Sequence, residues 1–166
     1  MRTKSLSILF LCTGNSCRSI LAEATFNALA PANMRAMSAG SQPAGYVRPR
    51  SLALLEREGI STEGYYSKSW NDLKITPDVV ITVCGNAANE TCPAYLGSHL
   101  GNVIRAHWGV DDPAKATGTE AEIDASFNLA YRTLRRRIEA FLALPLSEFA
   151  ADKAKFTQEL ARIGKL

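Results

Sequence analysis

One short segment constrains this chain more than any other, and it lies between a strand-like run and a helix-like run. The segment is Cys12-Thr13-Gly14-Asn15-Ser16-Cys17-Arg18-Ser19. The six residues before it, Leu6 to Leu11, form an apolar run of strand length. The residues after it, Ile20 to Ala30, carry apolar side chains at helical spacing. The pattern therefore predicts a strand, a tight loop and the N-terminus of a helix.

The loop has the composition of an anion-binding site. We expect Gly14 to permit unusual backbone angles, so that successive N–H groups converge on one point as in a nest. The helix N-terminus adds positive potential there, and the planar guanidinium of Arg18 can bind two oxygens of a tetrahedral oxyanion. The predicted oxyanion ligands are Thr13, Gly14, Asn15, Ser16, Cys17, Arg18 and Ser19.

Cys12 begins the loop and is expected to face the same pocket. The loop amides, the helix end and Arg18 all favour the thiolate, so we expect the pKa of Cys12 to be lowered. The sequence therefore predicts that Cys12 is a nucleophile beneath a bound oxyanion. The alternative interpretation is a buried strand-end cysteine beside a surface arginine, which the loop chemistry disfavours.

The composition fits one soluble domain with a sizeable core, because 46% of the 166 residues are hydrophobic and 21% are charged. The net charge of +3 suits an anionic substrate and does not indicate nucleic acid. The N-terminal apolar run is too short for a signal peptide or a membrane span, so we expect a cytoplasmic protein without membrane contact. The four cysteines have neither the spacing of a zinc site nor the density of a secreted disulfide scaffold.

The rest of the chain alternates between strand and helix patterns. Strands are expected over residues 35–40, 78–84 and 102–108, and helices over 49–59 and 120–144. A last helix is expected from Ser147, with Phe149, Phe156, Leu160 and Ile163 on one face. The run Arg135-Arg136-Arg137 is interpreted as the solvent face of the long helix. We predict an α/β fold with a parallel sheet over residues 1–144, followed by a helical extension over 145–166.

Three motifs in this order resemble a known family. Cys12 and Arg18 have the Cys-x5-Arg spacing of tyrosine phosphatases, and their position near the N-terminus resembles the low-molecular-weight phosphatases. The fuller string CTGNSCRS is similar to the arsenate reductases built on that fold, as are VVITVCG at 79–85 and HWGVDDP at 107–113. The resemblance covers about residues 5–144. It implies a four-stranded parallel sheet flanked by helices, with the loop at the carboxyl end of the first strand.

The resemblance also assigns roles outside the loop. An Asp-Pro pair supplies the general acid in the family, and the match falls on Asp112, with Asp111 as a solvated neighbour; the alternative is a turn carboxylate before proline. Cys84 and Cys92 match the strand-end and loop cysteines of the relay in thioredoxin-linked arsenate reductases. Their spacing of eight is one longer than is usual there, which places an insertion in the relay loop. Cys17 is interpreted as a small core residue, with a resolving cysteine as the alternative.

Some family members bind potassium near the loop through an asparagine, a glutamate, a serine and an aspartate. Asn15, Glu23 and Ser38 could match the first three. Ser69 stands where the aspartate is expected, and the adjacent Lys68 could supply the cation instead. We therefore expect no bound metal.

The expected activity is the reduction of arsenate to arsenite. Cys12 would attack arsenic, and the disulfide would then pass from Cys12 and Cys84 to Cys84 and Cys92. No bound cofactor is expected; electrons would come from thioredoxin, or from glutaredoxin with glutathione, and the protein is expected to be a monomer. A phosphotyrosine phosphatase using Cys12, Arg18 and Asp112 is the first alternative, although it would leave Cys84 and Cys92 without a task. The second is a catalytically silent binding protein of the same fold.

Overall fold

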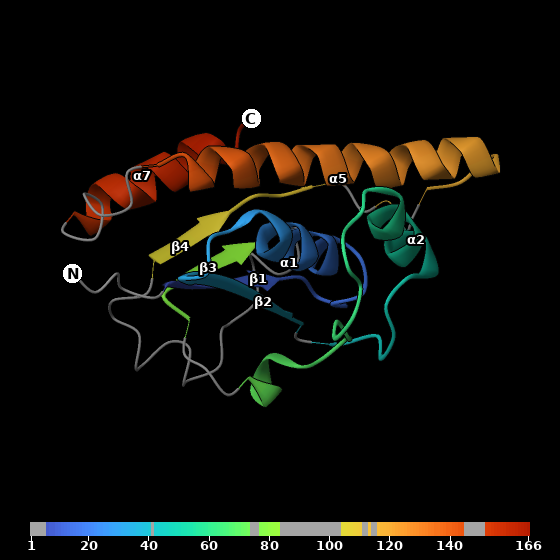
Figure 1. Ribbon diagram of the computed structural model, residues 1–166, viewed down its shortest axis with the longest axis horizontal. Coiled ribbons are helices and arrows are strands. Elements are labelled where there is room, and N and C mark those ends of the chain that lie inside the picture. Colours follow the sequence, from blue (N-terminus) through green and yellow to red (C-terminus); the bar gives the residue numbers. More distant parts are fainter. Residues whose placement is uncertain are drawn as a thin grey trace.

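Four parallel strands form one sheet at the centre of the molecule. The computed structural model describes residues 6–40, 42–73, 77–83, 104–110, 113, 116–144 and 152–166. The strands are β1 (Leu6–Leu11), β2 (Met34–Ala39), β3 (Val79–Thr82) and β4 (Ile104–His107), in the spatial order β2-β1-β3-β4 (Figure 1). All three pairings are parallel. The predicted α/β class with a four-stranded parallel sheet is confirmed.

The central strand is apolar on both faces because both faces are covered. Ile8, Leu9 and Phe10 of β1 are completely buried, although their side chains alternate between the two faces. Figure 1 shows helix α1 (Arg18–Leu29) directly on the sheet and α5 (Glu120–Leu142) beyond it. Every residue from Ser19 to Phe26 is buried, since α1 lies between the sheet and α5. The loop therefore opens a helix that cannot move independently of the core.

The remaining helical elements are shorter, and their ends follow local capping chemistry. Helix α2 (Pro49–Arg57) begins at a proline, which is favoured in the first turn. The 3-10 turn η1 (Trp70–Asp72) lies on the opposite side of the sheet from α5 in Figure 1. Helix α5 begins with a capping box formed by Thr119 and Glu122.

The C-terminal helix α7 (Lys153–Ile163) packs into the same core as the sheet. Asp152 caps it by accepting a hydrogen bond from the Lys155 N–H at 3.0 Å, while the expected cap Ser147 and Phe149 lie outside the described residues. Phe156, Leu160 and Ile163 are buried, as their spacing predicts. None of the helices in the described ranges is both long enough and apolar enough to cross a membrane.

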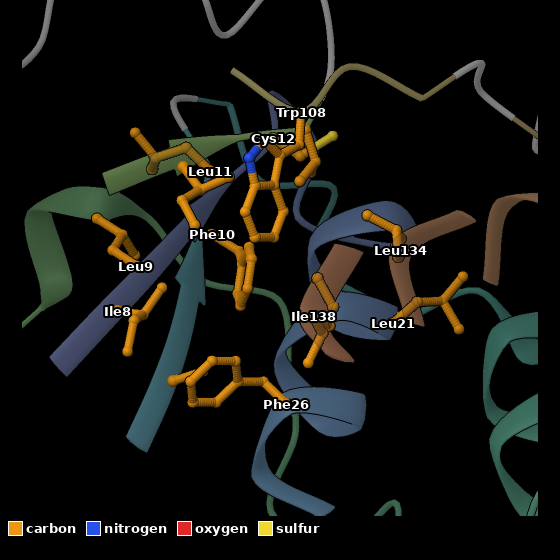
Figure 2. Packing of buried hydrophobic residues seen from close by; sticks show 14 of the residues in the cluster. Ile8, Leu9, Phe10, Leu11, Cys12, Leu21, Phe26, Trp108, Leu134 and Ile138 are labelled. Atoms are coloured by element: carbon orange, nitrogen blue, oxygen red, sulfur yellow. The ribbon is translucent and has the colours of Figure 1, made fainter. Parts of the chain in front are cut away.

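A chain of aromatic side chains joins the sheet to the helices. Phe10 of β1 contacts Phe26 of α1 and Trp108 after β4, with ring centroids 6.1 and 6.2 Å apart (Figure 2). Phe141 of α5 contacts both Phe26 and Trp108, at 5.7 and 6.3 Å, and it also contacts Phe156 at 5.9 Å. The indole N–H of Trp108 donates to the Leu160 carbonyl of α7 at 2.9 Å. The segment that follows β4 is thereby fixed from two sides.

One prediction about α5 is wrong. Arg135 and Arg136 are on its accessible side, but Arg137 is only 7% exposed. Its guanidinium Nη1 donates to the Gly109 carbonyl at 3.2 Å. The run of three arginines spans 200° of the helix, so its last member turns back towards the sheet.

Candidate active site

The carboxyl ends of the strands bring distant segments of the chain together. Cys12 follows β1, Gly40 follows β2, Val83 follows β3 and Trp108 follows β4. Backbone hydrogen bonds continue past the ends of the strands. The Cys12 N–H donates to the Ala39 carbonyl at 3.2 Å. The Val83 N–H donates to the Leu11 carbonyl at 2.9 Å, and the Trp108 N–H donates to the Thr82 carbonyl at 2.7 Å. The loop at 12–19 therefore lies at the edge where open α/β sheets bind ligands.

The loop's carbonyl groups are bound by a neighbouring segment, residues 42–48. The carbonyls of Thr13, Gly14 and Ser16 accept hydrogen bonds from three backbone N–H groups. The donors are Gln42 at 3.0 Å, Ala44 at 2.8 Å and Arg48 at 2.8 Å, respectively. In a trans peptide the C=O and the following N–H point in opposite directions. The N–H groups of residues 14, 15 and 17 thus point away from this segment, as a nest for an anion requires.

Asn15 supplies the special backbone conformation of the loop. Its φ is +46°, the left-handed region, whereas Gly14, which we expected to provide the unusual angles, does not have a positive φ. The Asn15 amide nitrogen donates to the hydroxyls of Ser19 at 2.8 Å and Ser38 at 2.9 Å. Its amide oxygen accepts from the Lys68 N–H at 2.8 Å. Asn15 is completely buried, and these hydrogen bonds hold the loop in shape.

Gly40 is a functional position that the sequence interpretation missed. A Cβ atom on Gly40 would lie 2.6 Å from the Cys12 carbonyl oxygen and still closer to that of Thr13. Only glycine allows β2 to end this close to the catalytic loop. The signal available in the sequence was a glycine directly after an apolar strand.

Cys12 and Arg18 occupy the two ends of the loop. Cys12 is 4% exposed and lies at the end of β1 (Figure 2). Arg18 is the first residue of α1, two positions earlier than the helix we expected, and its Nη1 donates to the Val110 carbonyl at 3.0 Å. Cys17 is buried in the core at 4% exposure, which favours its interpretation as a core residue.

A buried polar cluster supports the loop from below. Glu23 on α1 accepts a hydrogen bond from the Ser38 hydroxyl at 2.6 Å, and the Lys68 ammonium lies 3.9 Å from the same carboxylate oxygen. The side chains of Glu23 and Lys68 are 9% and 11% exposed. Burial raises the pKa of Glu23, and the charge of Lys68 and the hydrogen bond from Ser38 partly oppose that rise. Burial lowers the pKa of Lys68, against the pull of Glu23.

The Lys68 ammonium therefore lies beside Glu23, one of the residues that could match the potassium ligands of the family. This ammonium also donates to the Tyr66 carbonyl at 3.0 Å and lies 4.6 Å from the Tyr66 ring centroid. Ser69 is used differently, as the cap of η1. Among the described residues, no group of three or more His, Cys, Asp or Glu side chains could hold a metal ion.

Three predicted site residues lie outside the described part of the chain: Asp112, Cys84 and Cys92. Asp111, the expected solvated neighbour, lies outside it as well. The residues before Cys84 and Asp111 are described. Val83, which precedes Cys84, is buried, and its carbonyl accepts from the Val110 N–H at 3.1 Å. Val110, which precedes Asp111, also binds Arg18 through its carbonyl. The chain therefore enters both predicted segments next to Arg18.

A pocket of about 300 Å³ is lined by residues of α2, α5 and the segments before them. Its lining residues are Arg48, Pro49, Arg50, Ala116, Ile123 and Phe127. One of them, Arg48, donates its backbone N–H to the Ser16 carbonyl of the loop. Arg50 pairs with Glu120 and Asp124, which joins α2 to the start of α5.

Comparisons with known proteins agree with this geometry. An arsenate reductase of Halalkalibacterium halodurans is 38% identical over 135 residues, which is 81% of this chain and 93% of that protein. An arsenate reductase of Bacillus subtilis is 36% identical over the same shares. A solved structure of an arsenate reductase in its phosphate-binding state is 25% identical with a TM-score of 0.68, covering 83% of this chain and 97% of that one.

The fold is shared with phosphatases as well. A low molecular weight protein tyrosine phosphatase of Streptococcus pyogenes has a TM-score of 0.66 at 19% identity, over 89% of this chain and 99% of that one. The family model of the low molecular weight phosphotyrosine protein phosphatases matches residues 7–155. The chain belongs to the low molecular weight phosphotyrosine protein phosphatase family.

Proposed function

We propose that this protein is an arsenate reductase that uses Cys12 as its nucleophile. The observation that carries the proposal is the loop at 12–19, whose carbonyls at 13, 14 and 16 are bound on one side so that the N–H groups face the other. Cys12 and Arg18 stand at its two ends. A tetrahedral oxyanion fits such a site, and relatives that are 38% and 36% identical over 81% of this chain are named arsenate reductases.

The proposed first step forms a bond between the Cys12 sulfur and arsenic. One As–O bond breaks, and its oxygen leaves as water after protonation by Asp112. The loop N–H groups and Arg18 bind the remaining oxygens and stabilise the charge that develops on them.

The proposed second step is the reduction. The Cys84 thiolate attacks the Cys12 sulfur, a disulfide forms, and the S–As bond breaks with its electron pair remaining on arsenic. Arsenic(V) thereby becomes arsenic(III), and the two sulfurs together supply the two electrons. Cys92 then attacks Cys84, which frees Cys12 and leaves a Cys84–Cys92 disulfide for an external dithiol. Thioredoxin is the proposed reductant, with glutaredoxin and glutathione as the alternative, in a reducing cytoplasm where the reaction serves arsenic detoxification.

Hydrolysis of phosphate monoesters is a second candidate activity, because the same loop geometry suits phosphate. Water can hydrolyse a phosphocysteine, so this activity needs Cys12, Arg18 and Asp112 but not Cys84 or Cys92. The two activities are therefore separable by mutation.

The deciding experiment counts arsenite in a single turnover without thioredoxin, combined with peptide mapping of disulfides. We expect Cys92→Ser to produce one arsenite per enzyme and to stop with a Cys12–Cys84 disulfide. Cys84→Ser should produce none, and Cys17→Ser, the matched control at a buried cysteine, should behave like the wild type. All three should hydrolyse p-nitrophenyl phosphate.

Two results would contradict the relay. Steady turnover of Cys92→Ser with thioredoxin would remove Cys92 from the mechanism, and turnover of Cys84→Ser would overturn the three-cysteine scheme. Hydrolysis of p-nitrophenyl phosphate without arsenite formation by the wild-type enzyme would favour the phosphatase.

A further inference from the structure

Arg137 is a buried cation that the proposed chemistry does not use. It is 7% exposed, and none of the described ion pairs includes it. Its Nη1 donates to the Gly109 carbonyl at 3.2 Å, and its buried Nε has no hydrogen-bond partner among the residues that the structure describes. Burial lowers its pKa, and the neighbouring charge of Arg136 adds to that effect.

A packing role alone does not account for an arginine at this position. The residues that share its helix face, Leu134, Ile138 and Phe141, are completely buried hydrophobic side chains. Burying a guanidinium without a carboxylate partner is costly, and one bond to a neutral carbonyl offsets only part of that cost. A leucine or methionine would fill the same space without this penalty. The hydrogen bond to Gly109 is therefore the feature that distinguishes Arg137 from its neighbours.

Gly109 belongs to a short segment, residues 108–110, that is bound along its length. Trp108 N–H donates to Thr82 at 2.7 Å, Trp108 Nε1 to Leu160 at 2.9 Å, and Val110 N–H to Val83 at 3.1 Å. These bonds fix the donors of the segment. Arg137 fixes the carbonyl of the peptide between Gly109 and Val110, so it sets the rotation of the backbone that leads into Val110.

The Val110 carbonyl in turn accepts a hydrogen bond from Arg18 at 3.0 Å. The Nε and Nη2 edge of the guanidinium, which does not include Nη1, has the geometry to bind two oxygens of an anion. The direction of this edge depends on where the Val110 carbonyl lies. We propose that Arg137 is a positioning residue, which orients Arg18 towards the oxyanion through Gly109 and Val110.

The inference rests on the proposed oxyanion site. Measurements of sulfate binding test the role of Arg137 and the oxyanion site separately. Arg137→Met keeps an unbranched side chain that is shorter than arginine, and it removes both charge and donor. Misorientation of a binding group by a fraction of an ångström to one ångström weakens its interaction strongly, so we expect a loss of about tenfold in sulfate affinity. Arg136→Met, at the exposed neighbour, removes the same charge and should change the affinity less than twofold. Arg137→Lys, which keeps one donor, should recover part of the loss.

A double-mutant cycle with Arg18→Lys separates positioning from general destabilisation. We expect Arg137→Met to have less than a twofold effect on sulfate affinity when Arg18 is already lysine, because the fork that it orients is gone. Dissociation constants come from titration calorimetry and, for weak variants, from sulfate-induced shifts in Tm. If Arg137→Met does not fold, the same cycle is run with Arg137→Lys.

The outcomes are distinct. An equal loss in both Arg18 backgrounds, or no loss in the wild-type background, overturns the role of Arg137. Failure of the wild-type protein to bind sulfate overturns the proposed oxyanion site itself. A lower Tm of Arg137→Met with unchanged sulfate affinity assigns Arg137 to stability alone and also overturns the inference.

Discussion

At the scale of single residues, the loop at 12–19 depends on polar side chains that are buried beneath it. Asn15, Ser38, Glu23 and Lys68 are joined by hydrogen bonds and an ion pair within the core. Such groups are stable in the interior only while every partner is present. Removing one of these side chains should therefore lower the free energy of unfolding by more than the contacts of that side chain alone suggest.

Lys68→Met is expected to destabilise the protein by about 1–3 kcal/mol, because it leaves the Glu23 carboxylate buried without its cation. The double variant Lys68→Met with Glu23→Gln should recover much of this loss, since the buried charge is then absent. Urea unfolding measures the change, with the exposed Lys165→Met as the control. Equal destabilisation of the single and double variants would show that Lys68 does not act through Glu23.

Glu23 should also make stability depend on pH. Its pKa is raised from 4.5 by burial, so the folded state holds a proton that the unfolded state has already lost. This contribution to the free energy of unfolding is fully present below pH 4.5 and is lost as pH rises through the folded pKa. Relative to Glu23→Gln, the wild type is thus expected to lose stability from pH 4.5 upwards. Urea unfolding of both proteins between pH 4 and 8 tests this. If the free energy of unfolding of the wild type, relative to that of Glu23→Gln, stays constant or rises with pH, the prediction is contradicted.

At the scale of elements, helices α5 and α7 hold the segment at 108–110 from outside the sheet. Leu160 is completely buried and its carbonyl binds the Trp108 indole, whereas Leu129 on α5 is 65% exposed. Both residues are leucines, one buried and one exposed, so they form a matched pair for substitution.

Leu160→Ala is expected to cost about 2–5 kcal/mol, the range for cavity formation in a core. Leu129→Ala should stay within about 0.5 kcal/mol, because surface positions contribute little. Thermal and urea unfolding of both variants provide the comparison. Similar values for the two would mean that α7 is only loosely attached to the rest of the fold.

Periodicity along the chain was sufficient to predict the elements. The spacing of Ile123, Phe127, Leu134, Ile138 and Phe141 predicted α5, and the β-branched run at 79–82 predicted β3. A helix with one buried face carries apolar residues at helical spacing, and a strand buried on both faces is a continuous apolar run. The pattern failed at Arg137, because a charged residue carries no periodic signal that separates a solvent face from a buried hydrogen bond.

At the scale of the whole molecule, the site is assembled from segments that are distant in sequence. The loop at 12–19 is contacted by residues 38–48, by 67–68 and by Val110. The family motif predicted Cys12 and Arg18 as site residues, since both lie in one short segment of the sequence. The role of Val110 could not be predicted, because it arises where parallel strands end together. For Gly40 the sequence offered only a glycine at the end of a predicted strand.

An anion at this assembled site should stabilise the entire fold. Binding to the folded state alone adds RT ln(1 + [L]/Kd), about 2.7 kcal/mol at a hundredfold excess over Kd. We expect sulfate to raise Tm in the wild type and to raise it much less in Arg18→Lys, whose ammonium cannot bind two oxygens in a fork. Chloride at matched ionic strength is the control. An equal rise in both proteins would indicate a general salt effect.

The left-handed conformation of Asn15 limits which residues position 15 can tolerate. Most side chains are strained at φ +46°, which leaves glycine and aspartate as the substitutes that the backbone accepts. Glycine would remove the three bonds that Asn15 makes to Ser19, Ser38 and Lys68. Aspartate would replace two donors by an acceptor and add a negative charge beneath the anion. The backbone conformation excludes most side chains, and the loss or reversal of hydrogen bonds excludes glycine and aspartate. We therefore expect no substitution of Asn15 to be neutral.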